Sequence, residues 1–451
     1  MITYSYRKIA DISWPLILGM VIQTLIGTTD TIFLGHVGEV ELGASAIGGL
    51  FYLLVYMIEH GFATGGQILM ARRFGRKGRN LKKIGNIFWL TNNVISGLSI
   101  AAIIAIYFTA YNILRLTIAQ EVLQSAILIY CIPRSFGLIF SGVKSVMSGF
   151  LVAINTTRHI AIASVILLVA NIGFDWWLIF GGWGIEPMGL KGAAIASVLA
   201  EAGATIYLAG YIAWRINWRK YGFDKFLLWH RELFREIMLM SSYIMLLSFL
   251  GWGTWLYFFI EIEKLGVEAL AISNILKSML SFLCIVASSL ATVTTSIVST
   301  LIGAGKNAEV LPTLKRIFKF GALPYYGGFL ILAIWPEQFL GLFTDDAALI
   351  ERAVGPLYTM LAANLIILPE SIYFYALFGA GRLKFALITE VICSVIYIAA
   401  IRIIIGVCRA DLEWCYLVDL VYYATALPIA YFYMQHGYWQ DGFNCKKAAT
   451  A

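Results

Sequence analysis

The stretch from Ile160 to Gly182, IAIASVILLVANIGFDWWLIFGG, decides the class of fold. It is long and apolar enough to cross a membrane once, because a helix needs about 20 mostly apolar residues to span a hydrocarbon core of about 30 Å. Two polar side chains interrupt it, the amide of Asn171 and the carboxyl of Asp175. A carboxyl group inside lipid is costly, so an acid at such a position predicts a functional site.

Apolar stretches of this length recur along the whole chain. Of its 451 residues, 60% are apolar and 13% are charged, whereas a soluble domain carries about 25% charged residues. We therefore predict an all-α polytopic membrane protein with twelve transmembrane helices. The predicted spans are residues 12–35, 42–71, 85–108, 125–152, 159–181, 189–214, 236–260, 268–302, 317–335, 352–379, 384–406 and 412–434.

Two other interpretations of the apolar runs are less favoured. Strands of a membrane barrel alternate apolar and polar residues, and these runs do not. The first apolar segment lacks a small-residue cleavage site and leads into a full-length span, so we expect a first helix rather than a signal peptide.

The net charge of +7 is unevenly distributed among the predicted loops. Even-numbered loops are basic: Arg72, Arg73, Arg76, Lys77, Arg79, Lys82 and Lys83 in the second, Arg215, Arg219, Lys220, Lys225, Arg231 and Arg235 in the sixth, and Lys306, Lys315, Arg316 and Lys319 in the eighth. Odd-numbered loops are acidic, including the segment 337–351 with Asp345. The positive-inside rule then predicts a multi-pass protein of the cytoplasmic (inner) membrane with both termini cytoplasmic. The basic loops act as topology signals, with lipid-headgroup binding as a weaker alternative and no role for nucleic acid.

An internal repeat divides the chain into two halves. Gly38 and Gly75 in the first half match Gly266 and Gly303 in the second at one constant offset. The offset spans an even number of helices, so the halves share one orientation and form two pseudo-symmetric six-helix lobes. We predict an N-terminal lobe at 1–214, a cytoplasmic linker at 215–235 and a C-terminal lobe at 236–451.

Polar side chains of the first lobe converge in depth. At a rise of 1.5 Å per residue from the loop glycines, Asp30, Asp175 and Ser197 lie about 8, 10 and 12 Å inside the external face. Asn171 lies one turn deeper than Asp175 on the same helix face, and Gln23 lies two turns below Asp30.

Two acids at one depth predict a cation site. In a dry pocket both cannot stay ionised, and a proton or a sodium ion held by oxygen ligands relieves the repulsion. The alternative is that Asp175 bonds a neighbouring helix for packing. The six cysteines form no C-x-x-C pair, so we expect no cofactor, although Cys408 and Cys415 flank an external loop and could bridge.

Other ionisable residues also fall inside predicted spans. They are Glu59, His60, Lys144, Glu201, Lys277, Glu390, Arg402 and Asp419. Such groups usually face a polar cavity or pair with one another. Lys144 pairs with a first-lobe carboxylate or meets an anionic part of the substrate, with pairing favoured. His60 either relays protons with Glu59 or makes a structural hydrogen bond.

Several quoted segments carry a family resemblance. PLILGMVIQTLIGTTDTIFLGHVGEVELGASA, GFATGGQILMARRFGRKG, NIGFDWWLIFGGWGIEPMGLKGAAIAS and LIGAGKN resemble the multidrug and toxic compound extrusion (MATE) family over essentially the whole chain. The resemblance implies two lobes around a V-shaped opening and efflux of organic cations in exchange for protons or sodium. In members with a first-lobe cation site it assigns that site to Asp30, Asn171, Asp175 and Ser197, the last replacing a threonine.

The first helix matches the family pattern at two further positions. Pro15 and Gln23 have the family's spacing to the helix 1 acid, and Pro15 removes a backbone donor, so we expect a bend or hinge there. The second lobe departs from other branches of the family, whose helix 7 glutamate falls near Gly251 and whose helix 10 acid falls near Ile367. Glu370 lies one turn from the latter position, which leaves open a displaced second acid.

Motifs for other functions are weak. GAGK at 303–306 lacks the phosphate-loop spacing, and neither G-x-S-x-G nor H-E-x-x-H occurs, so we predict a transporter rather than an enzyme or a passive scaffold. We expect a monomeric secondary antiporter in the lipid bilayer that exports cationic or amphiphilic small molecules by alternating access. The candidate cavity residues are Gln23, Lys144, Glu59, His60 and Glu370. The alternative is a flippase for lipid-linked precursors or metabolites, which Lys144 and Lys277 keep open.

Overall fold

A computed structural model describes residues 4–76, 81–117, 120–182, 184–227, 229–344 and 346–440. The loop residues Lys77, Arg79 and Asp345 of the charge pattern lie outside the described residues. The first half contains α1 (Tyr6–Val37), α2 (Glu39–Gly75), α3 (Lys82–Thr117), α4 (Glu121–Ser135), α5 (Gly137–Ala153), α6 (Arg158–Phe180), α7 (Gly189–Arg215) and α8 (Trp218–Tyr221).

The second half has a matching series of helices. It contains α9 (Arg231–Glu263), α10 (Val267–Gly303), the 3-10 turn η1 (Asn307–Glu309), α11 (Val310–Ile334), α12 (Pro336–Leu340), α13 (Ala347–Asn364), α14 (Ile367–Ala380), α15 (Leu383–Ile401), the π-helical turn η2 (Arg402–Val407), α16 (Leu412–Cys415) and α17 (Leu417–Gln435). The bounds of two of these helices agree with the predicted repeat. Helices α2 and α10 each have 37 residues, and each follows a glycine, Gly38 or Gly266.

The helices are long and apolar enough for a polytopic membrane protein. Eleven helical segments among the described residues qualify as single spans, and α4 with α5 adds a twelfth as a pair bent by 41°. The prediction of an all-α fold with twelve membrane-spanning helices is confirmed. The observed helices extend beyond most predicted spans because polar residues continue a helix past the apolar segment.

The predicted span 125–152 is broken, which the apolar pattern did not indicate. Helix α4 ends at Ser135 and α5 starts at Gly137. Pro133 lies in the last turn of α4, where it lacks a backbone donor and crowds the preceding turn. The predicted span 352–379 is likewise interrupted between α13 and α14, ahead of Pro369.

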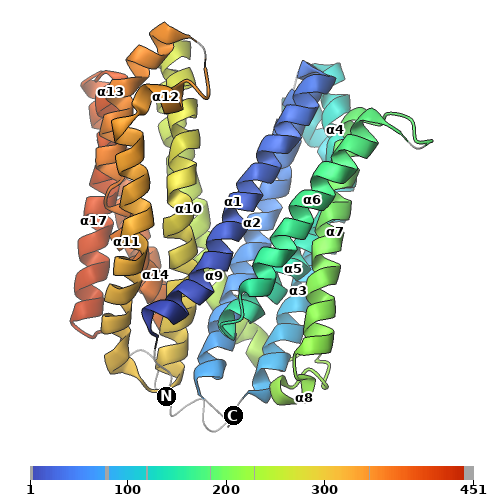
Figure 1. Ribbon diagram of the computed structural model, residues 1–451, viewed down its shortest axis with the longest axis vertical. Helices are drawn as coiled ribbons and strands as arrows, with labels where there is room; N and C mark the ends of the chain where they lie inside the picture. Colours follow the sequence, from blue (N-terminus) through green and yellow to red (C-terminus); the bar gives the residue numbers. More distant parts are fainter. Residues whose placement is uncertain are drawn as a thin grey trace. The chain divides into compact units, whose positions relative to one another are not determined.

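The chain forms two compact units, and each is described by itself. The N-terminal unit is Trp14–Met245, and the C-terminal unit comprises Leu246–Ala451 together with Met1–Ser13. The divisions fall inside α1 and α9. Within the N-terminal unit, α1 and α6 lie side by side (Figure 1), and Gly19 on α1 faces the hydroxyl of Ser164 on α6.

A core at one end of the N-terminal unit joins five of its helices. It consists of Leu34, Ala44, Ile127, Tyr130, Cys131, Ile179, Leu190, Ala193 and Ala194. Leu34 follows Asp30 by one turn of α1, and Ile179 follows Asp175 by one turn of α6. This apolar layer therefore lies directly beside the predicted acids and fixes the helices that carry them.

Candidate functional site

The two predicted acids of the first half lie together. Asp30 extends from α1, and Asp175 and Asn171 extend from α6 one turn apart. Asp175 is 0% exposed and Asn171 is buried beside it. The side chains of Asp175 and Asn171 both lie within hydrogen-bonding reach of the Asp30 carboxyl. Asp30 and Asp175, which the residue count places at similar depth in the membrane, are therefore neighbours in the structure.

This cluster contains polar atoms without hydrogen-bond partners. Five polar atoms make no hydrogen bond of normal geometry although they are buried: Asp30 Oδ1, both carboxyl oxygens of Asp175, and Oδ1 and Nδ2 of Asn171. Ionised carboxylates only accept hydrogen bonds, so two of them cannot bond each other. A proton on one carboxyl, or a sodium ion between the oxygens, would satisfy the cluster, and the donor set therefore fits either ion.

Other predicted residues of the first half surround this pair without joining it. Ser197 is buried on α7, whose Gly192 packs against the backbone of Leu178 on α6. No described contact links Ser197 to either acid. Gln23 is exposed on α1, and Pro15 is buried near the start of that helix.

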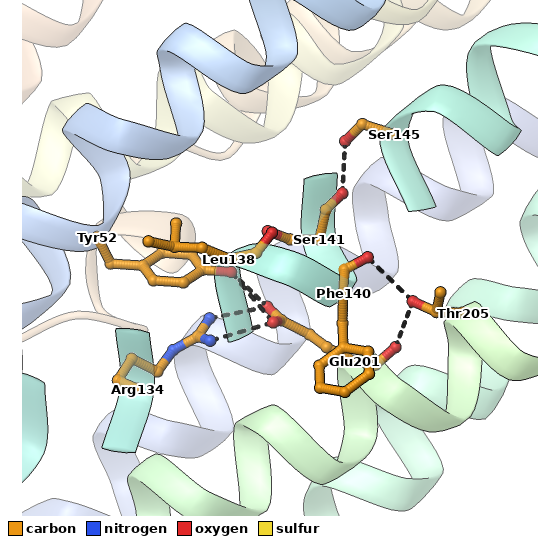
Figure 2. A network of polar contacts seen from close by, with 8 residues as sticks. All are labelled: Tyr52, Arg134, Leu138, Phe140, Ser141, Ser145, Glu201 and Thr205. Carbon is orange, nitrogen blue, oxygen red and sulfur yellow. Dashed lines mark hydrogen bonds and ion pairs between the residues drawn. The ribbon is translucent and has the colours of Figure 1, made fainter. Parts of the chain in front are cut away.

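A buried ion pair that the sequence analysis missed lies beside the acids. Arg134 on α4 donates from Nη2 to Glu201 Oε1 at 2.8 Å and from Nη1 to Oε2 at 3.1 Å. The hydroxyl of Tyr52 on α2 donates to the same carboxylate at 3.0 Å. The Tyr52 ring also stacks on the guanidinium, with 3.6 Å between Arg134 Cζ and the ring centroid. Figure 2 shows the three side chains converging from three helices.

The break between α4 and α5 positions Arg134. Gly137 starts α5, and a Cβ on it would clash with Arg134 Nη1 and lie 2.5 Å from Glu201 Oε2. The segment CIPRSFG, residues 131–137, therefore supplies the proline, the cation and the small residue that the pair needs. The available signal was Arg134 itself, a cation well inside the predicted span 125–152.

Arg134 links the ion pair to the two acids. Its charge and that of Glu201 both act on the Asp30 carboxyl. Tyr130, one turn before Arg134 on α4, lies within hydrogen-bonding reach of the guanidinium and near Asp30. The acids and the ion pair therefore form neighbouring polar layers in the N-terminal unit.

The favoured pairing of Lys144 with a carboxylate is wrong in this conformation. Glu201 is bound by Arg134, and Lys144 is half-buried on α5 with no ion pair among the described residues. Glu59 and His60 diverge, because Glu59 is buried and His60 is exposed. Glu59 accepts from Ser99 Oγ at 2.6 Å, whereas the His60 ring lies against Tyr56.

The C-terminal unit holds an acid pair of its own. Glu370 on α14 and Glu390 on α15 are both buried, and the charge of Glu390 acts on the Glu370 carboxyl. Tyr422 on α17 donates to Glu390 Oε2 at 2.7 Å. Glu390 Oε1 lies 3.7 Å from where a Cβ would stand on Gly251 of α9. Gly251 is the position at which other branches of the resembled family carry a glutamate. In this chain the neighbouring carboxyl comes instead from Glu390 on α15.

The remaining spanning charges of the C-terminal unit have partners. Asp419 accepts from Tyr397 at 3.0 Å and from Asn364 at 3.4 Å. The Lys277 ammonium lies 5.3 Å from the centroids of Trp255 and Phe259, a cation–π arrangement.

Neither a disulfide nor a transition-metal cluster appears in the described part of the chain. Cys408 is exposed and Cys415 is buried, and both are free thiols, so the suggested bridge is absent. In that part of the chain no three His, Cys, Asp or Glu side chains come together as ligands of a metal ion, and the Asp30 and Asp175 cluster contains two such side chains.

Comparisons with known proteins agree with this architecture. The sequence profile of the MatE family matches residues 15–177 and 244–401. A probable multidrug resistance protein NorM from Thermotoga maritima is 23% identical over 383 residues, 83% of this chain and 80% of that protein. One from Agrobacterium fabrum is 26% identical over 215 residues, so this chain spans only 44% of its length. A crystal structure of MATE in complex with MaL6 superposes with a TM-score of 0.86 at 16% identity, covering 96% of each chain, and shares the fold.

Proposed function

Since this chain belongs to the MatE family of transporters, we propose that it is a secondary active antiporter that exports organic, cationic or amphiphilic small molecules in exchange for protons or sodium ions. Relatives carry the name multidrug resistance protein. The chain is a transporter and not an enzyme. We further propose a monomer in the cytoplasmic membrane with both termini in the cytoplasm, as the distribution of basic loops indicates.

The observation that supports ion coupling is the contact between Asp30 and Asp175. A proton or sodium ion neutralises this acid pair, with Asn171 supplying a further ligand and Ser197 a hydroxyl at similar depth. The ion then favours the conformation in which the acids stay together, and its release allows the other one. At a membrane potential of about 100 mV, each charge moved supplies about 2.3 kcal/mol.

The conformational step is proposed to be a rocking of the two lobes, 1–214 and 236–451, joined by the linker 215–235. The two compact units support a plan of two bodies, although they divide within helices rather than at the linker. One division lies between Ser13 and Trp14, immediately before Pro15. A helix weakened by proline at this place is a suitable hinge.

Substrate contacts are assigned to Gln23, His60, Lys144 and Glu370. Gln23 and His60 are exposed, and Lys144 has no ion pair among the described residues, which leaves its ammonium available for an anionic group. The flippase alternative draws on this same lysine. Glu59 belongs to the same predicted cavity, but its carboxyl is enclosed between α2, α3 and α5.

The experiment is efflux of ethidium from proteoliposomes under an imposed proton or sodium gradient. The wild type is compared with Asp30→Asn and Asp175→Asn, and exposed Asp224→Asn serves as a matched control. Coupled efflux should fall at least tenfold in the first two variants and stay unchanged in the control. The gradient that drives efflux identifies the coupling ion.

If Asp30→Asn and Asp175→Asn both keep full gradient-driven efflux, these two acids do not form the ion-coupling site. Transfer of a fluorescent polyprenyl phosphate between leaflets, without ethidium efflux, would instead favour the flippase. Lys144→Gln separates the two further, because loss of its charge should impair movement of an anionic headgroup and spare movement of ethidium.

A further inference from the structure

Glu59 on α2 is a buried acid that the proposed coupling site does not use. Its side chain is 0% exposed. The carboxyl is enclosed by α3 and α5, which contribute Ser99, Ser141 and Gly142. A Cβ on Gly142 would lie 3.0 Å from Glu59 Oε2 and 2.5 Å from Ile95 Cγ2, so only glycine lets α5 approach this closely.

One oxygen of the Glu59 carboxyl has a hydrogen-bond donor, and the other has none. Ser99 Oγ donates to Glu59 Oε1 at 2.6 Å. Ser141 Oγ donates to the carbonyl of Leu138 at 3.1 Å, as Figure 2 shows. A hydroxyl has one hydrogen, so Ser141, which donates to its backbone, can only accept from Glu59.

The second carboxyl oxygen of Glu59 lacks a hydrogen-bond donor. Glu59 Oε2 is buried and has no hydrogen-bond partner of normal geometry, although the Ser141 hydroxyl lies within reach of the carboxyl. A proton on Oε2 would turn this oxygen into the donor that Ser141 Oγ can accept. One added proton therefore completes the hydrogen bonding of the group.

No cation among the described residues pairs with Glu59. The charged group that acts on it is Glu201 on α7, which is bound to Arg134 of α4. Lys144 on α5 interacts with Glu201 and Arg134. On α2 itself the neighbour is the phenol of Tyr56, and His60 is exposed. An ionised carboxylate buried without a counter-charge is costly, and a protonated one is not.

We propose that Glu59 is a proton-binding site, separate from the Asp30 and Asp175 pair, whose proton allows α2, α3 and α5 to pack closely. The ligand is a proton and not a metal cation. Sodium needs several oxygen ligands, whereas a methyl group of Ile95 and the backbone of Gly142 occupy the space at Oε2. Loss of the proton leaves a bare carboxylate between these helices and loosens their packing.

The proposal extends beyond transport, and its test needs no transported substrate. Infrared spectra are recorded on the purified protein carrying Asp30→Asn and Asp175→Asn, so that this acid pair does not contribute. The difference between this protein and the same protein with Glu59→Gln should contain the carbonyl stretch of a protonated carboxyl. That band should shift in heavy water and disappear at alkaline pH.

A second readout follows thermal unfolding against pH. Gln at position 59 keeps a donor and an acceptor but cannot ionise, so Glu59→Gln should match the parent at neutral pH and exceed its Tm at alkaline pH. Glu232→Gln, at an exposed acid of α9, should show no such divergence. If Glu59→Gln does not fold, Ser141→Ala replaces it and should move the frequency of the carbonyl band.

Carboxylate bands in place of the carbonyl band at neutral pH would overturn the proposal. So would a constant difference in Tm at every pH. Neither result would bear on ion coupling at Asp30 and Asp175, which the efflux experiment tests separately.

Discussion

Arg134 on α4 donates two hydrogen bonds, of 2.8 and 3.1 Å, to the carboxylate of Glu201 on α7. The Arg134 side chain is 13% exposed and the Glu201 side chain is 11% exposed. The pair joins a helix that ends at a break to one that is continuous. Because Tyr52 adds a hydrogen bond and a stacked ring, α2 is held by the same contact. This network fixes the helices that stand beside the acid pair.

Removing one partner of this ion pair should destabilise the protein strongly. Arg134→Gln leaves the Glu201 carboxylate buried with only the Tyr52 hydroxyl, and breaking a buried pair in this way costs about 3–5 kcal/mol. Thermal unfolding of the purified protein in detergent measures the effect. The double variant Arg134→Gln, Glu201→Gln should be more stable than Arg134→Gln alone, since no charge is then left unpaired. Additive losses would show that the two side chains act independently.

Gly137→Ala should disturb the same pair by steric overlap. The new methyl group would collide with Arg134 Nη1 and crowd Glu201 Oε2, and both must then shift. Gly97→Ala on α3 is the matched control, because a Cβ there meets nothing within 4 Å. Gly97→Ala should be neutral or should stabilise the protein by about 0.5–1 kcal/mol, the usual effect of replacing a glycine inside a helix by alanine. Equal Tm changes in the two variants would contradict the close packing at Gly137.

Asp175→Asn should raise stability and remove the response to ions. The amide ends the repulsion between two carboxyls and can donate to Asp30, a change of the type that stabilises by about 0.5–2 kcal/mol at the cost of function. The measurement is Tm with and without added sodium at two pH values. The wild type should gain stability from its coupling ion by mass action. A variant that keeps the full ion-dependent gain would argue against binding at this residue.

Tyr422→Phe should weaken the C-terminal unit by about 1–3 kcal/mol, because Glu390 Oε2 then loses its donor inside the protein. Tyr433→Phe on the same helix keeps its ring stacked on Phe385 and serves as the control. Adding Glu390→Gln to Tyr422→Phe should recover part of the loss, since an amide tolerates burial better than an acid. Unfolding in detergent distinguishes these cases, and no recovery would indicate that the tyrosine acts through packing alone.

Part of the candidate site could be predicted by counting residues. Asp30 and Asp175 were expected at similar depth, and they lie in contact. The count works because a membrane helix has a fixed rise per residue and starts at a loop. It gives no information about lateral neighbours, and so Arg134 was not matched with Glu201. Pro133 did not reveal by itself that the helix breaks at Phe136, because many helices tolerate a proline with only a kink.

The helical class, the number of spans and the repeat in which α2 and α10 follow Gly38 and Gly266 could all be predicted from the order of residues. These features depend on apolar length and on local backbone signals, which are encoded in consecutive residues. Three contacts became known from the packed helices alone: Glu201 pairs with Arg134 rather than Lys144, Glu59 contacts Ser99 rather than His60, and Glu390 lies beside Gly251. Such partners are set by the rotation of each helix about its axis and by its neighbours, and both follow from packing across the whole unit.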